Sequence, residues 1–203
     1  MEKIALFDFD ETITSKDTLV LFLRFFLGTK RFYCYLCLLS PWITLYFLGI
    51  YPNYKLKILF LRFCFRSYKV SEFKMVAKKF ALSTELKQVI RENALAKIQW
   101  HKAQGHRVIV VSATLKEYLS WWCEQQQLEL LATEITFSND QMGDGFHLNN
   151  CYGEEKVQRT KLYLGISDKH PASRNHYYLY AYGDSQGDRE LLAFANEGHY
   201  QLF

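Results

Sequence analysis

The chain contains no internal repeat, no low-complexity linker and no cleavable leader ahead of the apolar stretch that begins at Ile4. These absences exclude repeat architectures and make a processed, secreted product unexpected. The five cysteines are an odd number, which does not suit a disulfide framework, so we expect a reduced, cytoplasmic setting. Cys34 and Cys37 have the spacing of zinc ligands, but they lack a second pair, and we expect them to pack in the interior.

Positive charge is unevenly distributed over the 203 residues. The net charge is +4, yet residues 16–79 hold twelve Lys or Arg and two acidic residues, a local balance of +10, and the remainder is at −6. This division suggests an insert with its own role, since a chain of this length can form one core that carries a smaller insert. A solvated basic face is the alternative.

Strand-like and helix-like segments alternate outside the basic region. A β-branched run such as HRVIVVSAT predicts a strand buried on both faces, and apolar residues at helical spacing predict amphipathic helices. The alternation predicts an α/β fold with a Rossmann-like parallel sheet and right-handed crossovers. The expected strands are 3–8, 106–114, 130–138, 176–185 and 199–203, the expected helices are 86–104, 115–127, 154–165 and 188–195, and 139–145 is an expected turn.

Carboxylates gather at the expected carboxyl ends of the strands, where parallel sheets bind ligands. Asp8, Asp10 and Glu11 follow the first strand, and like charges at low dielectric raise each other's pKa unless a cation lies among them. Oxygen ligands, a hydroxyl and a lysine together are the components of a Mg²⁺ and phosphoryl site. The other residues expected at this edge are Ser112, Thr114, Asp184 and Asp188, with Lys156 nearby.

Four short motifs give the chain a resemblance to the haloacid-dehalogenase-like superfamily of phosphatases. The first motif, Asp-x-Asp-x-Thr, is matched by DFDET, and the second, an apolar strand that ends in Ser or Thr, is matched by VVSAT. The third, a basic residue, is matched by the lysine of YGEEKV, and the fourth, Gly-Asp-x-x-x-Asp, is matched by GDSQGD. Each motif is weak alone, but four in register over nearly the whole chain are specific. The resemblance implies a core domain at residues 1–17 and 83–203 and an inserted helical cap at 18–82, as in subfamily IB members similar to phosphoserine phosphatase.

The resemblance also implies roles for the motif residues. Asp8 would attack phosphorus and form an aspartyl-phosphate, and Asp10 would protonate the leaving oxygen and later activate water. Ser112 and Lys156 would hold the phosphoryl oxygens, and Thr12 would help to fix the loop. The expected cofactor is Mg²⁺, and its expected ligands are the carboxylates of Asp8 and Asp184, the backbone carbonyl of Asp10, and Asp188, which acts through water or orients Lys156.

Two residues of the cap and one just before it are candidates for substrate binding. Asp17 falls where phosphoserine phosphatase uses an acidic residue to meet the substrate amine, and a polar flap residue is an equal alternative. Arg62 and Arg66 stand one helical turn apart and would present cations to an anionic substrate. Surface arginines without such a role are the alternative.

Residues 32–54 carry no charge, and a stretch of this length raises the question of a membrane span. A single crossing would place Asp8 and Asp184 on opposite sides of the bilayer, although they must share one metal, and Pro41 breaks the run. Two alternatives remain: a buried hairpin of the cap, or an interfacial segment that meets anionic lipid. Aromatic residues together with the +10 charge favour a peripheral position at the inner face of the membrane.

We therefore expect an enzyme, a Mg²⁺-dependent phosphomonoester hydrolase. A basic, apolar insert near the phosphoryl site favours a phospholipid head-group phosphate, and CYGEEKV, the cap and the uncharged run resemble bacterial phosphatidylglycerophosphatases of this superfamily. A soluble-metabolite phosphatase of the phosphoserine phosphatase type is the first alternative. Alternatives from other classes are a phosphorylated receiver-like switch and a membrane-associated binding protein. We expect no nucleic-acid partner, and the sequence leaves the oligomeric state open.

Overall fold

The computed structural model describes residues 1–203, apart from the side chains at positions 53, 142, 144 and 171. The strands are β1 (Glu2–Phe7), β2 (Arg107–Leu115), β3 (Glu129–Thr133), β4 (Ile135–Ser138), β5 (Gln141–Phe146), β6 (Tyr177–Gly183) and β7 (Glu197–Tyr200). The α-helices are α1 (Thr18–Leu27), α2 (Thr29–Phe47), α3 (Asn53–Phe65), α4 (Val70–Ala81), α5 (Thr84–Lys87), α6 (Glu92–Ala103), α7 (Lys116–Gln126), α8 (Glu154–Leu164) and α9 (Arg189–Phe194).

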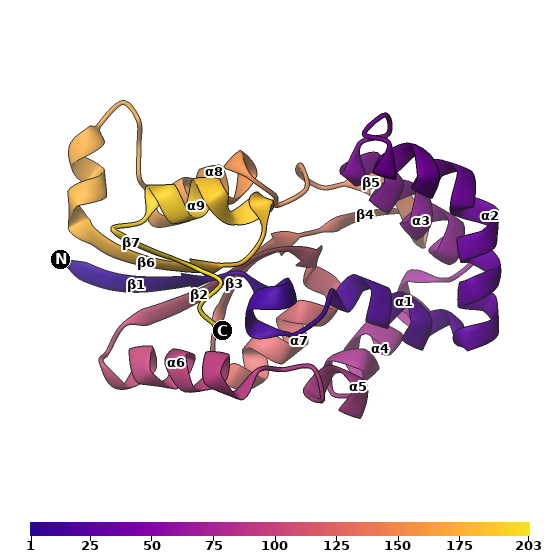
Figure 1. Cartoon of the computed structure of the whole chain (residues 1–203), viewed down its shortest axis with the longest axis horizontal. Coiled ribbons are helices and arrows are strands. Elements are labelled where there is room, and N and C mark those ends of the chain that lie inside the picture. Colours follow the sequence, from indigo (N-terminus) through magenta and orange to yellow (C-terminus); the bar gives the residue numbers. More distant parts are fainter.

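Five strands form one parallel sheet in the order β3-β2-β1-β6-β7, and β4 pairs with β5 in a separate antiparallel hairpin. Helices α8 and α9 cover one face of the sheet, and α6 and α7 cover the other (Figure 1). The chain passes outward from β1 to β3 and then returns to place β6 beside β1, so the strand order reverses at β1, where such sheets bind ligands. The predicted α/β fold with a Rossmann-like parallel sheet is confirmed.

Strand β1 is apolar on both faces because it lies in the middle of the sheet. Successive side chains of a strand point to opposite faces. Ile4 and Leu6 therefore pack in one cluster with residues of α8 and α9, whereas Ala5 and Phe7 pack in a second cluster with residues of α6 and α7. All four side chains are fully buried, and burial of a large apolar side chain contributes roughly 1.5–3 kcal/mol. This burial fixes where the end of β1, and with it the site, lies.

Helices α1 to α4 lie together beyond the carboxyl ends of the strands (Figure 1). We call residues 18–82 the helical insert. Its Phe22, Phe73 and Phe80 side chains belong to the same apolar cluster as Tyr118 of α7, and the rings of Phe22 and Tyr118 are 5.0 Å apart. The insert thus shares a core with the rest of the molecule. The division of the chain into a core domain and a cap remains a prediction.

Most of the uncharged run lies in α2, and most of its side chains are not buried. The buried residues of this helix are Phe32 and Leu39, whereas Trp42 and Phe47 are among the exposed ones. Cys34 and Cys37 are also exposed, so the expectation that they pack in the interior is wrong. Within the described part of the chain, we find no helix with the length and apolar character that a membrane crossing requires.

Pro41 lies inside α2 and does not break it, contrary to the expectation from the sequence. A proline has no N–H to donate to the carbonyl one turn earlier, here that of Cys37. The Ser40 hydroxyl donates to the Cys37 carbonyl instead, at 2.8 Å. The Cys37 carbonyl thus keeps a hydrogen-bond donor, and the helix continues to Phe47.

Other predicted segments also differ in detail. The expected strand at 130–138 is divided into β3, which belongs to the parallel sheet, and β4, which pairs with β5, and the last strand lies at Glu197–Tyr200 where 199–203 was expected. The expected single helix at 86–104 is divided into α5 and α6, because the backbone N–H of Arg91 donates to the Ile13 carbonyl at 2.8 Å and Ile90 forms a bridge with Thr14. Contacts with the loop after β1 thus override the local helical pattern. The expected turn at 139–145 is shorter, since Asn139 and Asp140, both with positive φ, make the turn and β5 begins immediately afterwards.

A buried chain of polar groups lies under β6. His101 Nδ1 is 2.9 Å from His106 Nδ1, and His101 Nε2 is 2.9 Å from the Tyr182 hydroxyl. Burial, followed by the neighbouring His106, lowers the pKa of His101 to about 4. The imidazole is therefore neutral at pH 7 and supports Tyr182, whose backbone carbonyl accepts a hydrogen bond from the N–H of Asp8 at 2.9 Å.

This arrangement predicts acid-sensitive stability. As the pH falls below 6.5, His101 takes up a proton in the unfolded chain, but in the folded protein it does so only at about pH 4. The contribution of His101 to the free energy of unfolding is therefore complete above pH 6.5 and is lost as the pH falls from 6.5 to 4. The loss amounts to at most about 3 kcal/mol. Urea unfolding at pH 7.5 and pH 4.5 should show a smaller pH dependence in His101→Gln than in the unaltered protein. An equal dependence in both proteins would contradict the assignment.

Candidate active site

Asp8 stands at the carboxyl end of the central strand, directly after the buried Phe7. Its backbone is held between strands, because its N–H donates to the carbonyl of Tyr182 in β6. The chain then leaves the sheet in a tight coil over Phe9–Ile13, in which Glu11 has a φ of 62° and points an exposed side chain outward. This turn buries Asp8 and Thr12 and half-buries Asp10. Residues 8–12 therefore form the floor of the site.

Lys156 of α8 is buried between two carboxylates. Its ammonium lies 2.6 Å from Asp8 Oδ1 and 2.6 Å from Asp188 Oδ1. Only 2 % of the Lys156 side chain is exposed, so each charge depends on the others for the solvation that it has lost. Burial alone would lower the pKa of Lys156, but Asp8 and Asp188 raise it overall. The lysine is a permanent cation of this site.

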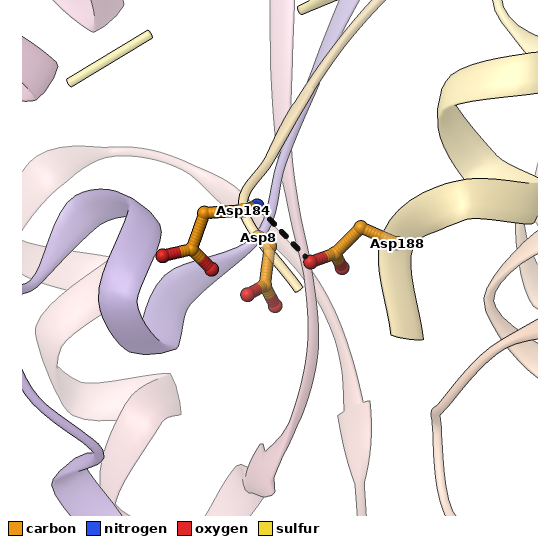
Figure 2. Close-up of side chains that lie close together, drawn as sticks. All are labelled: Asp8, Asp184 and Asp188. Carbon is orange, nitrogen blue, oxygen red and sulfur yellow. Dashed lines mark hydrogen bonds between the residues drawn. The ribbon is translucent and has the colours of Figure 1, made fainter. Parts of the chain in front are cut away.

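Asp184 completes a group of three carboxylates. Each of Asp8, Asp184 and Asp188 offers an oxygen within 4.8 Å of the others, and Figure 2 shows the three side chains around a common space. Asp188 uses its second oxygen to accept from the Ser185 hydroxyl at 2.7 Å and from the backbone N–H of Asp184 at 3.3 Å. Asp184 Oδ1, by contrast, is buried and has no hydrogen-bond partner. Its free oxygen suits a cation.

Gly183 allows Asp188 to come this close. A Cβ at position 183 would lie 2.4 Å from the Cβ of Asp188 and 2.7 Å from its carboxyl carbon. No real side chain tolerates such contacts, so the glycine of the GDSQGD motif is required by the approach of Asp188 to Lys156.

The carboxylates differ in their affinity for protons. Burial raises the pKa of Asp8 to about 8, although Lys156 opposes the shift, and burial raises that of Asp184 to about 6. Burial also acts on Asp188, but Lys156 and the Ser185 hydrogen bonds lower its pKa overall. Asp188 is thus the charged ion-pair partner of Lys156, whereas a further cation would stabilise the charged forms of Asp8 and Asp184.

Asp10 belongs to a separate hydrogen-bonded chain. Its Oδ1 accepts from the backbone N–H of Thr18 at 2.9 Å and from the Thr18 hydroxyl at 2.5 Å, and that hydroxyl is 2.8 Å from the hydroxyl of Tyr118. Tyr118 also contacts the Thr114 hydroxyl. Burial, followed by the nearby Asp17, raises the pKa of Asp10 to about 7. Asp10 can therefore give or take a proton near neutral pH.

Ser112 and Thr12 are both buried. Ser112 lies just before a shift in the pairing register of β2 with β3, and its hydroxyl oxygen accepts from the backbone N–H of Thr114 at 3.1 Å. Its own proton remains available for another acceptor. The Thr12 hydroxyl is buried without a partner, and Thr12 lines a small cavity together with Gly183 and Asp184. Both hydroxyls can donate to a ligand in the site.

A family model of haloacid dehalogenase-like hydrolases matches residues 5–193. The chain belongs to this family. The predicted resemblance and the prediction of an enzyme are thereby confirmed, and a receiver-like switch or a binding protein without activity loses its support. We therefore describe the remaining features as those of a haloacid dehalogenase-like hydrolase.

Individual relatives agree with the family. Protein CicA of Caulobacter vibrioides is 29% identical over 202 residues, which cover 98% of this chain and 86% of that relative. A Bordetella pertussis protein of unknown function has a similar fold, with a TM-score of 0.81 at 19% identity, over 95% of this chain and 86% of that chain. A phosphoserine phosphatase solved as a phospho-aspartyl intermediate analogue has a TM-score of 0.60 at 16% identity, over 98% and 85%. This likeness of fold is consistent with subfamily IB.

The structure places Asp17 just before the helical insert and the other two predicted substrate-binding residues, Arg62 and Arg66, within it. Asp17 is exposed and caps α1, since its carboxylate accepts from the N–H groups of Leu19 and Val20. Arg62 is exposed on α3, and the exposed Arg66 follows the end of that helix. Their roles toward a substrate remain predictions.

Sequence reasoning missed Lys57. This half-buried lysine of α3 donates to the Ala113 carbonyl, next to Ser112, and to Asn150 Oδ1 at 3.3 Å. Its sequence signal is a lysine just after the uncharged run, five residues before Arg62. Spacing alone gave no reason to prefer it, because only the packing of α3 against the β4–β5 hairpin brings it to the site.

The buried ion pairs make a stability prediction for this hydrolase. Lys156→Met leaves Asp8 and Asp188 buried without their cation, and we expect the free energy of unfolding at pH 7 to fall by about 3–5 kcal/mol. The double variant Lys156→Met/Asp188→Asn removes one of the stranded charges and should recover part of the loss. Urea unfolding without added metal measures both. A single variant as stable as the unaltered protein would refute the interpretation.

Proposed function

We propose that this hydrolase is a Mg²⁺-dependent phosphomonoester phosphatase in which Asp8 is the nucleophile. The observation that carries the proposal is the buried Asp8, held at 2.6 Å by Lys156 beside Asp184 and Asp188. A carboxylate nucleophile divides one difficult displacement at phosphorus into two easier ones. The fold shared with a phosphoserine phosphatase whose structure represents a phospho-aspartyl intermediate agrees with this chemistry.

The donor set suits Mg²⁺, which prefers hard oxygen ligands. Asp8 and Asp184 would hold the ion with their carboxylates, and Asp10 would contribute its backbone carbonyl. The buried, unpartnered Asp184 Oδ1 supports this assignment, as does the raised pKa of both carboxyls. Asp188 already bonds Lys156 and Ser185 with its two oxygens, so its role is to orient the lysine. When bound, Mg²⁺ neutralises charge on Asp8 and on the phosphoryl oxygens.

The residues of the chain then account for both steps. An Asp8 oxygen forms a bond to phosphorus while the bond from phosphorus to the leaving alcohol breaks, and Asp10 gives its proton to the alcohol oxygen. Water next loses a proton to Asp10 and attacks phosphorus, which releases phosphate and restores Asp8. Throughout, Ser112 and Lys156 donate hydrogen bonds to the phosphoryl oxygens. Thr12, with its unpartnered hydroxyl, steadies the loop and the bound group.

Asp8→Asn should abolish phosphatase turnover, by at least about a thousandfold, because the nucleophile is lost. The variant should remain folded, because Lys156 keeps its ion pair with Asp188 at 2.6 Å. Release of phosphate from p-nitrophenyl phosphate measures turnover, and chelation should abolish it as well. Glu11→Gln, an exposed neighbour, is the matched control and should remain active. Substantial turnover by pure Asp8→Asn would end the nucleophile assignment.

For the substrate, we propose a phosphate ester on an anionic lipid, with phosphatidylglycerophosphate as the example. Several large apolar side chains are exposed along α2 and the turn after it: Tyr33, Leu38, Trp42, Phe47, Leu48 and Ile50. The exposed cations Lys30 and Arg31 begin the same helix. Aromatic and basic residues together are typical of a segment at a membrane surface. Such a protein would lie at the inner face of the membrane without crossing it.

The lipid proposal predicts salt-sensitive binding to vesicles that contain phosphatidylglycerol, and weaker binding to vesicles of phosphatidylcholine alone. Phe47→Ser should reduce binding by about tenfold, because an inserted phenylalanine is lost. Leu162→Ser, at an equally exposed apolar residue on α8, is the control and should bind normally. Co-sedimentation measures these affinities.

A parallel phosphatase assay compares phosphatidylglycerophosphate with phosphoserine, phosphocholine and sugar phosphates. The lipid should be the best substrate. Preference for a soluble metabolite together with no vesicle binding at low salt would leave the alternative, a phosphatase of the phosphoserine phosphatase type, to which the structural likeness also points.

A further inference from the structure

Lys57 is the cation that the helical insert brings to the active site. It lies on α3, and its ammonium donates to the carbonyl of Ala113 and to Asn150 Oδ1. Both acceptors are neutral, and no carboxylate forms an ion pair with Lys57 among the side chains that the structure describes. Its charge is therefore not cancelled by a direct partner, in contrast to that of Lys156, which bonds two carboxylates.

The Lys57 ammonium lies next to segments that contain or precede proposed phosphoryl-binding residues. Ala113 follows Ser112, a proposed phosphoryl-binding residue, and Asn150 lies in the segment that leads into α8, so Lys57 joins the end of β2 to that segment. Burial lowers its pKa to about 8, and among the carboxylates that raise it Asp10 has the largest effect. Asp10 is the proposed acid for the leaving oxygen. The charge of Asp10 thus acts on Lys57, which is mostly charged at pH 7.

We propose that Lys57 determines specificity by donating a hydrogen bond to an oxygen of the leaving alcohol, other than the oxygen bonded to phosphorus. An ammonium has three protons, and two are used by Ala113 and Asn150. The third is free for a hydroxyl, ester or carboxylate oxygen on the alcohol. The inference rests on the proposed phosphatase function and narrows its substrates to esters of oxygen-rich alcohols, as opposed to simple alkyl phosphates.

The test compares glycerol 3-phosphate with n-propyl phosphate, which has the same carbon chain without the two hydroxyls. We expect Lys57→Met to lower the ratio of their kcat/KM values by roughly tenfold, the effect of a lost charged hydrogen bond, chiefly through KM. Lys57→Arg should recover part of the ratio. Lys55→Met, an exposed lysine of the same helix, should leave it unchanged. Phosphoserine as a third substrate shows whether a carboxylate oxygen is read in the same way.

Each outcome decides the inference. If Lys57→Met lowers the kcat/KM of glycerol 3-phosphate or of phosphoserine relative to that of n-propyl phosphate, the inference is supported. The substrate that is affected then shows whether Lys57 binds a hydroxyl or a carboxylate oxygen. An equal loss on every substrate, or no loss, overturns it, since Lys57 would then serve only to seat the insert. Lys57→Gln, which keeps a donor but carries no charge, is the second variant if Lys57→Met does not fold. Absence of Asp8-dependent turnover of p-nitrophenyl phosphate by the unaltered protein would instead refute the proposed function itself.

Discussion

The pairing of Lys156 with Asp8 and Asp188 is the constraint on which the rest of the site depends. Three charges are buried there, and none is stable without the others, because removal from water costs each ion several kcal/mol. Each comes from a different part of the chain: Asp8 ends β1, Lys156 lies in α8, and Asp188 precedes α9. The ion pairs therefore require β1, β6 and both helices of one face to be correctly placed. A gap at Gly183, where any side chain would collide with Asp188, is part of the same requirement.

Asp10, the proposed proton donor, is held in place by a different set of contacts. Asp10 is held by Thr18, the first residue of α1, and through it by Tyr118 of α7. Lys57 ties α3 to the segment after Ser112. The helical insert thus contacts the site through polar residues at two places, and its aromatic side chains share a core with Tyr118. Displacement of the insert would alter the surroundings of Asp10 while Asp8 and Lys156 stayed in place.

Much of the fold followed from periodicity and motif order. The buried character of β1 and β2, the helix at 154–164 and the glycine-rich segment after β6 were all indicated by residue pattern, because central parallel strands must be apolar on both faces. The errors had two different causes. Hydrogen bonds to the loop after β1 divide α5 from α6, and this contact between residues distant in sequence has no local signature. In α2 the cause is local, because the Ser40 hydroxyl, next to Pro41, bonds the Cys37 carbonyl that the proline leaves without a donor.

The sequence by itself determined the family and the residues from which the site is built, since the four motifs place carboxylates, a hydroxyl and a lysine at the ends of strands that must lie side by side. Only the tertiary structure decided how these groups divide their work. It showed that Asp188 is fully occupied by Lys156 and Ser185 while an oxygen of Asp184 is free. It also brought Lys57 to the site and left Arg62 and Arg66 exposed on the surface. The physical reason is that protonation, desolvation and hydrogen-bond satisfaction depend on neighbours distant in sequence, which spacing along the chain does not specify.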